Sequence, residues 1–89
     1  MVMLVKRRGK KEKFDERKLY ASIYSACMDC NLGEKRCENM AAKIVPQVKK
    51  FLKGRKEPNT SEIFGFVLQK LAKENEAAAF MYETHRDLS

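Results

Sequence analysis

The sequence is poor in the residues that carry most catalytic chemistry. Its 89 residues include no tryptophan and one histidine, His85. A lone histidine near a chain end is more typical of a surface position than of a general base, and no Ser/His/Asp order indicates a nucleophile. The glycine-rich phosphate loops G-x-x-x-x-G-K-[ST] and G-x-G-x-x-G do not occur either. We therefore do not expect an enzyme.

Long hydrophobic runs are missing as well. Every unbroken apolar run is far shorter than the roughly 20 residues that a transmembrane helix needs. The N-terminus is apolar first and basic afterwards, which is the reverse of a signal peptide. These features predict a cytoplasmic protein without a membrane partner. The length predicts a single domain over residues 1–89, with one modest core.

Cysteine is scarce and odd in number, with Cys27, Cys30 and Cys37. In a reducing compartment this argues against a disulfide framework. Cys27 and Cys37 fall on the apolar stripes of two expected helices, so we favour core packing of both thiols. The alternative is a zinc site made of the three thiols and a fourth ligand such as His85. We expect no metal.

Positive charge is what the chain has in excess. It carries 19 Lys and Arg residues against 12 Asp and Glu, a formal net charge of +7. Eight of these cations lie between Lys6 and Lys18 beside three acids, which gives this stretch a local charge of 8 − 3 = +5. Basic proteins favour polyanionic partners such as nucleotides or nucleic acid. The clustering favours a dedicated anion site, and a solvated basic hairpin without a ligand is the alternative.

The fold class that we expect is α+β, mainly α: a four-helix bundle capped by an N-terminal β-hairpin. Strands are predicted over residues 2–6 and 11–14, with the turn at Gly9. Strand alternation would place Glu12 and Phe14 on one face and the neighbouring lysines on the other. A short link ending at Asn59 could add a third strand.

Helical spacing predicts four helices. The first follows Asp15 as N-cap and runs to about Asp29, and the second runs from about Glu34 to Leu52. Pro46 should kink or divide the second helix. The third is capped by Asn59 or Thr60 and ends near residues 73–75. The last helix would bury Ala77, Phe80, Met81 and Leu88.

An anion site can be assembled from these elements. Lys6 and Arg7 stand at the end of the first strand, and Lys18 lies one turn into the first helix. Lysine offers a compact charge to several phosphate oxygens, and arginine offers a planar fork. The third helix would present N–H groups at Thr60, and Phe64 or Tyr20 could pack on a base.

Three segments resemble the ATP-cone domain. The stretch from Leu4 to Leu19, LVKRRGKKEKFDERKL, is similar to the opening of that domain. The segment Thr60–Ile63 resembles its Thr/Ser-Ser-x-Ile segment, and Ala79–Asp87 resembles its closing helix. The resemblance covers about residues 2–88. It implies a four-helix bundle under a short, roughly three-stranded sheet, and allosteric binding of ATP or dATP, with or without Mg²⁺.

By position, the resemblance assigns the phosphate contacts to Lys6, Arg7 and Lys18. It assigns contacts with the base or sugar to Leu4 and Leu19. Glu12 and Asp15 match positions that read the base and support the site, and Thr60 matches a further nucleotide contact. Phe64 stands where some cones carry a histidine that touches phosphate, and phenylalanine offers stacking instead.

The function that we expect is therefore a stand-alone adenine-nucleotide-binding regulatory domain that switches self-association or partner binding. Cones usually belong to ribonucleotide reductases or to the repressor of reductase genes, so the resemblance implies a reductase or a regulator acting in trans as the partner. Two alternatives remain: a basic nucleic-acid-binding protein, and a degenerate cone that acts only as a protein-interaction module.

Overall fold

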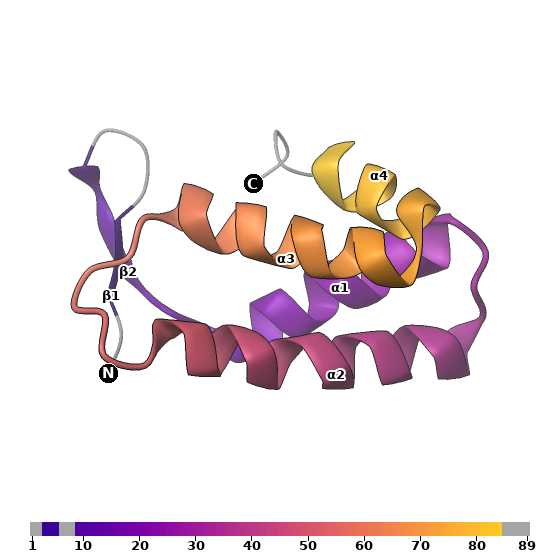
Figure 1. Cartoon of the computed structure of the whole chain (residues 1–89), viewed down its shortest axis with the longest axis horizontal. Coiled ribbons are helices and arrows are strands. Elements are labelled where there is room, and N and C mark those ends of the chain that lie inside the picture. The colour runs from indigo at the N-terminus through magenta and orange to yellow at the C-terminus, as the bar shows by residue number, and fades with distance from the viewer. Residues whose placement is uncertain (1–2, 6–8, 85–89) are drawn as a thin grey trace.

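Four helices and a two-stranded antiparallel hairpin make up the fold in the computed structural model, which describes residues 3–5 and 9–84 (Figure 1). The elements in chain order are β1 (Met3–Val5), β2 (Lys11–Lys13), α1 (Glu16–Asp29), α2 (Glu34–Leu52), α3 (Thr60–Glu74) and α4 (Glu76–Thr84). The predicted fold class, mainly helical with an N-terminal hairpin, is confirmed. No helix among the described residues is long and apolar enough to cross a membrane.

The hairpin pairs three residues of each strand, with Leu4 opposite Glu12. Gly9 has a φ of +74°, a turn conformation that glycine adopts without strain. Lys11 and Lys13 are exposed, whereas Glu12 is half-buried and Phe14 packs against the core. The predicted alternation of faces is therefore confirmed, in strands shorter than expected.

The third strand is reduced to a single contact. Val5 forms an isolated parallel bridge with Asn59, and its N–H donates to the Pro58 carbonyl at 3.0 Å. In the described residues the sheet has two strands, so the three-stranded sheet expected from the resemblance is not formed. A physical reason is that proline has no N–H to extend the ladder.

Side-chain caps fix where the helices begin. The Asp15 carboxylate accepts hydrogen bonds from the backbone N–H groups of Arg17 (2.9 Å) and Lys18 (3.4 Å), as predicted for an N-cap. Asn59, not Thr60, caps α3, since its side chain accepts from the Ser61 N–H at 2.7 Å.

Asn75 separates α3 from α4 by itself. Its N–H donates to the Leu71 carbonyl at 2.7 Å and so closes α3. Its side-chain oxygen accepts from the Ala78 N–H at 3.0 Å and so begins α4. The predicted break between the two helices is confirmed at this residue.

Pro46 lies inside α2 without dividing it, because the helix is continuous from Glu34 to Leu52. Pro46 and Ala42, whose carbonyl loses its helical partner, are both exposed. Water can therefore satisfy that carbonyl. The predicted division of the helix is wrong.

The core draws on all four helices and on Leu4 of the hairpin. The stripes predicted for α1 to α3 are buried, apart from Phe51 and Phe66, which are half-buried. The face predicted for α4 is right only at Met81, which is half-buried and packs against the core. Ala78, Ala79 and Tyr82 are buried, whereas Phe80 is 62% exposed and Ala77 is also exposed. Leu88 lies outside the described residues.

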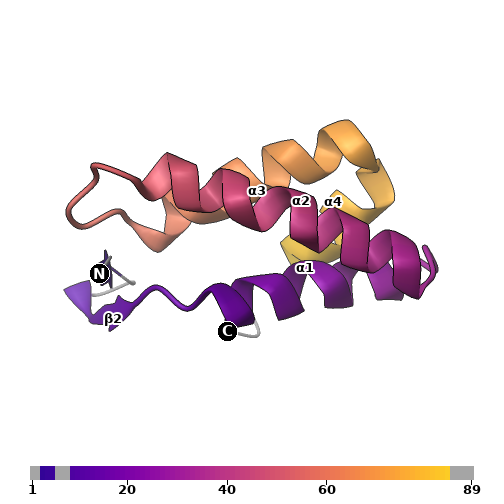
Figure 2. The same ribbon diagram turned by 90° about the horizontal axis from the view of Figure 1, so that it is seen from below.

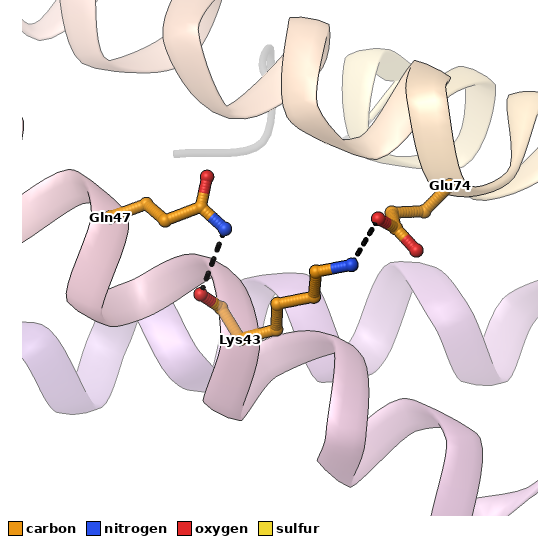
Figure 3. A network of polar contacts seen from close by, with 3 residues as sticks. All are labelled: Lys43, Gln47 and Glu74. Carbon is orange, nitrogen blue, oxygen red and sulfur yellow. Dashed lines mark hydrogen bonds and ion pairs between the residues drawn. The ribbon is translucent and has the colours of Figure 1, made fainter.

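Residues spaced four apart on α2 line the surface of the seam between α2 and α3. At one end the Lys43 ammonium pairs with the Glu74 carboxylate, and the Gln47 side chain donates to the Lys43 carbonyl at 3.2 Å (Figure 3). The ion pair joins the middle of α2 to the end of α3, and the Gln47 bond lies within α2.

Further along the same seam, the contacts between α2 and α3 are made by aromatic rings. The rings of Phe51 and Phe66 meet edge to face with centroids 4.5 Å apart. The Arg55 guanidinium lies 4.3 Å from the Phe51 ring centre and also pairs with Glu62 at 3.0 Å. The Lys70 ammonium lies 5.2 Å from the Phe66 ring centre. The seam thus keeps the start of α3 beside the end of α2.

Candidate functional site

The hairpin, the start of α1 and the connection from α2 to α3 meet at one end of the bundle (Figures 1 and 2). The Val5 N–H···O=C Pro58 bond places β1 directly before the first turn of α3. An ion pair of 3.0 Å between Lys11 and Glu57 ties β2 to the same connection. Segments about 50 residues apart in sequence therefore share one surface.

The first turn of α1 brings Asp15, Lys18 and Leu19 together. Asp15 holds the turn by capping it, so its carboxylate is already engaged with backbone N–H groups. Lys18 is exposed, and within the described residues no carboxylate pairs with it. Leu19 is 8% exposed and packs in the core, so only an edge of it can reach a ligand. The turn can therefore present one cation beside an apolar edge.

The inner face of the hairpin carries Leu4 and Glu12. Leu4 is buried in the core, and Glu12, its cross-strand neighbour, is half-buried. A carboxylate accepts hydrogen bonds, so this position suits an amino group such as the exocyclic amine of adenine. The arrangement combines an apolar wall with one acceptor.

The start of α3 contributes Thr60 and Phe64, one turn apart. Both are half-buried. The Phe64 ring stacks on Tyr82 of α4, with centroids 5.2 Å apart and planes inclined by 17°. Part of the Phe64 ring is thus committed to packing within the protein.

Two predicted phosphate contacts, Lys6 and Arg7, lie outside the described residues. His85, considered above as a fourth zinc ligand, lies outside them too. The structure describes the other seven of the nine predicted nucleotide contacts in three local groups: Leu4 and Glu12 pair across the hairpin, Asp15, Lys18 and Leu19 lie at the start of α1, and Thr60 and Phe64 lie at the start of α3.

Surface ion pairs use part of the charge at this end. Lys49 pairs with Glu16 at 3.3 Å, in addition to the Lys11–Glu57 and Arg55–Glu62 pairs. All of these side chains are about half exposed, so each pair contributes roughly 0–1 kcal/mol. Such pairs position side chains more than they stabilise the fold.

The cysteines lie away from this end, in the core. Cys27 and Cys37 are fully buried, which confirms the core-packing prediction. Burial raises the pKa of the Cys27 thiol from 9.0 to about 12 and also raises the pKa of Cys37. The half-buried Cys30 thiol donates to the Cys27 carbonyl at 3.3 Å. Within residues 3–5 and 9–84, no three His, Cys, Asp or Glu side chains are grouped so that they could hold a metal ion.

Sequence reasoning missed Tyr82 and Glu57. Tyr82 is 8% exposed and contacts a candidate site residue, but the residues one turn before it are Ala78 and Ala79, so no stripe of large apolar side chains singled it out. No local sequence pattern predicts that Glu57 pairs with Lys11, which lies 46 residues away. Its place before Pro58 indicated only an extended backbone.

Comparison with known proteins relates the chain to one family. The profile of the ATP cone domain matches residues 2–88. The chain is 31% identical over 91 residues to the transcriptional repressor NrdR of Kosmotoga olearia, covering 98% of this chain and 56% of the relative. It is 34% identical over 91 residues to NrdR of Thermosipho melanesiensis, covering 98% and 59%. For NrdR of Crocosphaera subtropica the identity is 35% over 79 residues, covering 86% and 40%.

The chain thus spans about half the length of the curated relatives that it matches. ATP cones are non-catalytic regulatory domains that bind adenine nucleotides. The match extends from the hairpin through all four helices. This chain belongs to the ATP cone domain family.

Proposed function

We propose that this chain binds ATP or dATP where the hairpin, the start of α1 and the start of α3 meet, and that occupancy switches its self-association or its binding to a partner protein. The observation that carries the proposal is the Val5–Pro58 backbone bond, which sets β1 beside the first turn of α3 in a chain of the ATP cone family.

The phosphates are assigned to the cations. Lys18 is exposed in the first turn of α1, and Lys6 and Arg7 follow β1 in sequence. Charge-assisted hydrogen bonds from these three side chains are the strongest contacts available to a phosphate chain. The positive end of the α3 dipole, at Thr60, adds to the attraction. Mg²⁺ would accompany the phosphates as a counterion.

The base and sugar are assigned to the apolar and acidic positions. Glu12 would accept a hydrogen bond from the amino group of adenine, which guanine lacks at that position. Leu4 and Leu19 would present apolar edges, and Phe64 would stack. Asp15 would act through the helix start, by holding the turn that presents Lys18.

The partner is a protein, either a second copy of this chain or a reductase or regulator supplied in trans. The relatives are named transcriptional repressors, so a regulatory partner fits the family. Sedimentation of the chain with and without nucleotide would separate self-association from binding in trans.

Calorimetric titration with ATP, dATP and GTP tests the site. We expect binding of the adenine nucleotides and at least tenfold weaker binding of GTP, which is about 1.4 kcal/mol. Absence of binding at millimolar ATP and dATP would refute the proposal.

The double variant Lys6→Ala/Lys18→Ala should abolish binding, because the phosphates lose two of their three countercharges. The matched control is Lys35→Ala/Lys73→Ala, which removes the same charge from exposed positions outside the hairpin and the starts of α1 and α3. Equal losses in both double variants would point to net charge alone.

A further inference from the structure

Helix α4 is short and rests on two neighbours. It spans Glu76–Thr84 and packs against α1 and α3. Asn75 alone separates it from α3. Nine residues are too few for a stable helix in isolation, so the order of α4 depends on its side-chain contacts with α1 and α3.

Tyr82 makes a central part of those contacts. It is 8% exposed, and its ring stacks on Phe64 of α3 at 5.2 Å. Burial raises the pKa of the Tyr82 phenol, and its hydroxyl lies near enough to the Ser22 side chain of α1 for Ser22 to offset part of that rise. The Ser22 hydroxyl in turn donates to the Leu19 carbonyl at 2.8 Å. One side chain of α4 thus reaches both helices on which α4 rests.

The partners of Tyr82 belong to the candidate nucleotide site. Phe64 is the residue assigned to stacking, and Leu19 is assigned to an apolar edge. Tyr82 is therefore one contact removed from the place where a base would lie, on the side of Phe64 that faces α4.

We propose that Tyr82 is a positioning residue that couples nucleotide occupancy to the order of α4. A base packed on Phe64 restrains that ring, and the stacked Tyr82 ring carries the restraint into α4. The coupling needs no large movement, since a ligand that rigidifies one contact lowers the entropic cost of ordering the next. This inference rests on the proposed function.

The outward face of α4 explains why its order matters. Phe80 is 62% exposed, the most exposed large hydrophobic side chain in the described part of the chain. Glu76 and Glu83 lie one turn away on either side of it, and the helix carries no Lys or Arg in a chain of net charge +7. Nucleotide binding would therefore control the order of one surface of α4 that is both apolar and acidic.

Hydrogen exchange measured by mass spectrometry tests the coupling on the full chain. Calorimetry first sets saturating ATP or dATP. We then expect amides of residues 76–84 to exchange about fivefold more slowly with nucleotide than without it. In Tyr82→Leu, which loses both the ring stack and the hydroxyl, nucleotide should still bind within about threefold while the slowing in α4 disappears.

Two further variants separate coupling from damage to the fold. Tyr82→Phe keeps the ring stack and loses the hydroxyl, so it should retain most of the slowing. Phe80→Ala changes an exposed residue of the same helix and should leave the slowing unchanged. If Tyr82→Leu does not fold, a slowing in Tyr82→Phe that is smaller than in the wild type but larger than zero still supports the coupling through Tyr82, and a slowing equal to that of the wild type assigns it to the ring alone.

The outcomes are distinguishable. No calorimetric binding by the wild type would overturn the proposed function, and this inference with it. Binding without any change of exchange in residues 76–84 would overturn the coupling and leave the proposed function standing. Slowing that persists in a folded Tyr82→Leu variant would overturn the role of Tyr82.

Discussion

At the candidate site, single residues combine structural roles with proposed binding roles. Asp15 is the clearest case, because its carboxylate caps α1 and also stands at a position assigned to nucleotide binding. Leu4 and Leu19 are similar, since both are core residues at positions assigned to base or sugar contacts. Substitutions at these positions need a pair of variants, one for each task.

Asp15 allows such a pair. Asp15→Ala removes the cap and should lower the free energy of unfolding by about 1 kcal/mol, measured by urea denaturation. Asp15→Asn keeps a capping oxygen and should stay within a few tenths of a kcal/mol of the wild type. If Asp15→Asn nevertheless weakens ATP binding in calorimetry, the charge itself serves the nucleotide. Equal destabilisation by both variants would contradict the capping role.

The buried thiol of Cys27 and phenol of Tyr82 predict a loss of stability in alkali. Burial raises the pKa of Cys27 from 9.0 to about 12 and that of Tyr82 from 10.0 to about 12. Above pH 9 the unfolded chain releases protons that the native state keeps, so the free energy of unfolding falls as pH rises towards 12. Below pH 9 this stabilisation is fully present.

Thermal melts between pH 8 and pH 11 measure this slope. Cys27→Ala should flatten it between pH 9 and pH 10, where the thiol is the first of the two groups to ionise in the unfolded chain. Ser25→Ala, which changes an exposed residue of the same helix that does not ionise in this pH range, is the control and should leave the slope unchanged. An unchanged slope in Cys27→Ala would contradict the effect of burial.

At the scale of elements, the connections decide the arrangement. Asn75 closes α3 and opens α4 with one side chain and one backbone N–H. Asn75→Ala should therefore lower the free energy of unfolding by about 1 kcal/mol, whereas Asn75→Asp keeps the capping oxygen and should cost little. Urea denaturation compares the two. Equal stability of Asn75→Ala and the wild type would show that the cap is dispensable.

The helices could be predicted because their signals are local. Asp15 and Asn59 mark helix starts, and the stripes of α1 to α3 repeat at helical spacing. The buried face of α4 could not be predicted, because an alanine-rich run offers more than one apolar stripe. The buried face of α4 is the one that carries Tyr82. Which face is buried depends on how α4 packs against α1 and α3 after the break at Asn75.

The candidate site could be predicted only in part, for a related reason. The motifs identify candidate residues, but the sequence does not show that Val5 and Pro58 are in contact. That contact depends on the α2–α3 seam, where Phe51 meets Phe66 and Arg55 meets Glu62. Such pairs become recognisable only once the two helices are known to be antiparallel neighbours.

For the whole molecule, ligand binding and stability are linked. ATP at 100 times its dissociation constant should raise the free energy of unfolding by about 2.7 kcal/mol. For a domain of this size each kcal/mol shifts the melting temperature by about 4–8 °C, so a shift of roughly 10–20 °C is expected. The same concentration of GTP should give a much smaller shift. Equal shifts by both nucleotides would indicate non-specific phosphate binding.

The contact between Val5 and Pro58 also has a consequence for synthesis on the ribosome. The hairpin leaves the exit tunnel before the helices do, yet its partner is made 53 residues later (58 − 5). At a translation rate of roughly 5–20 residues per second, several seconds pass between the synthesis of the hairpin and that of its partner. A two-stranded hairpin is marginal in water, so β1 and β2 would settle only after Asn59 has emerged. A segment translated before all four helices would then be among the last parts of the domain to reach its final place.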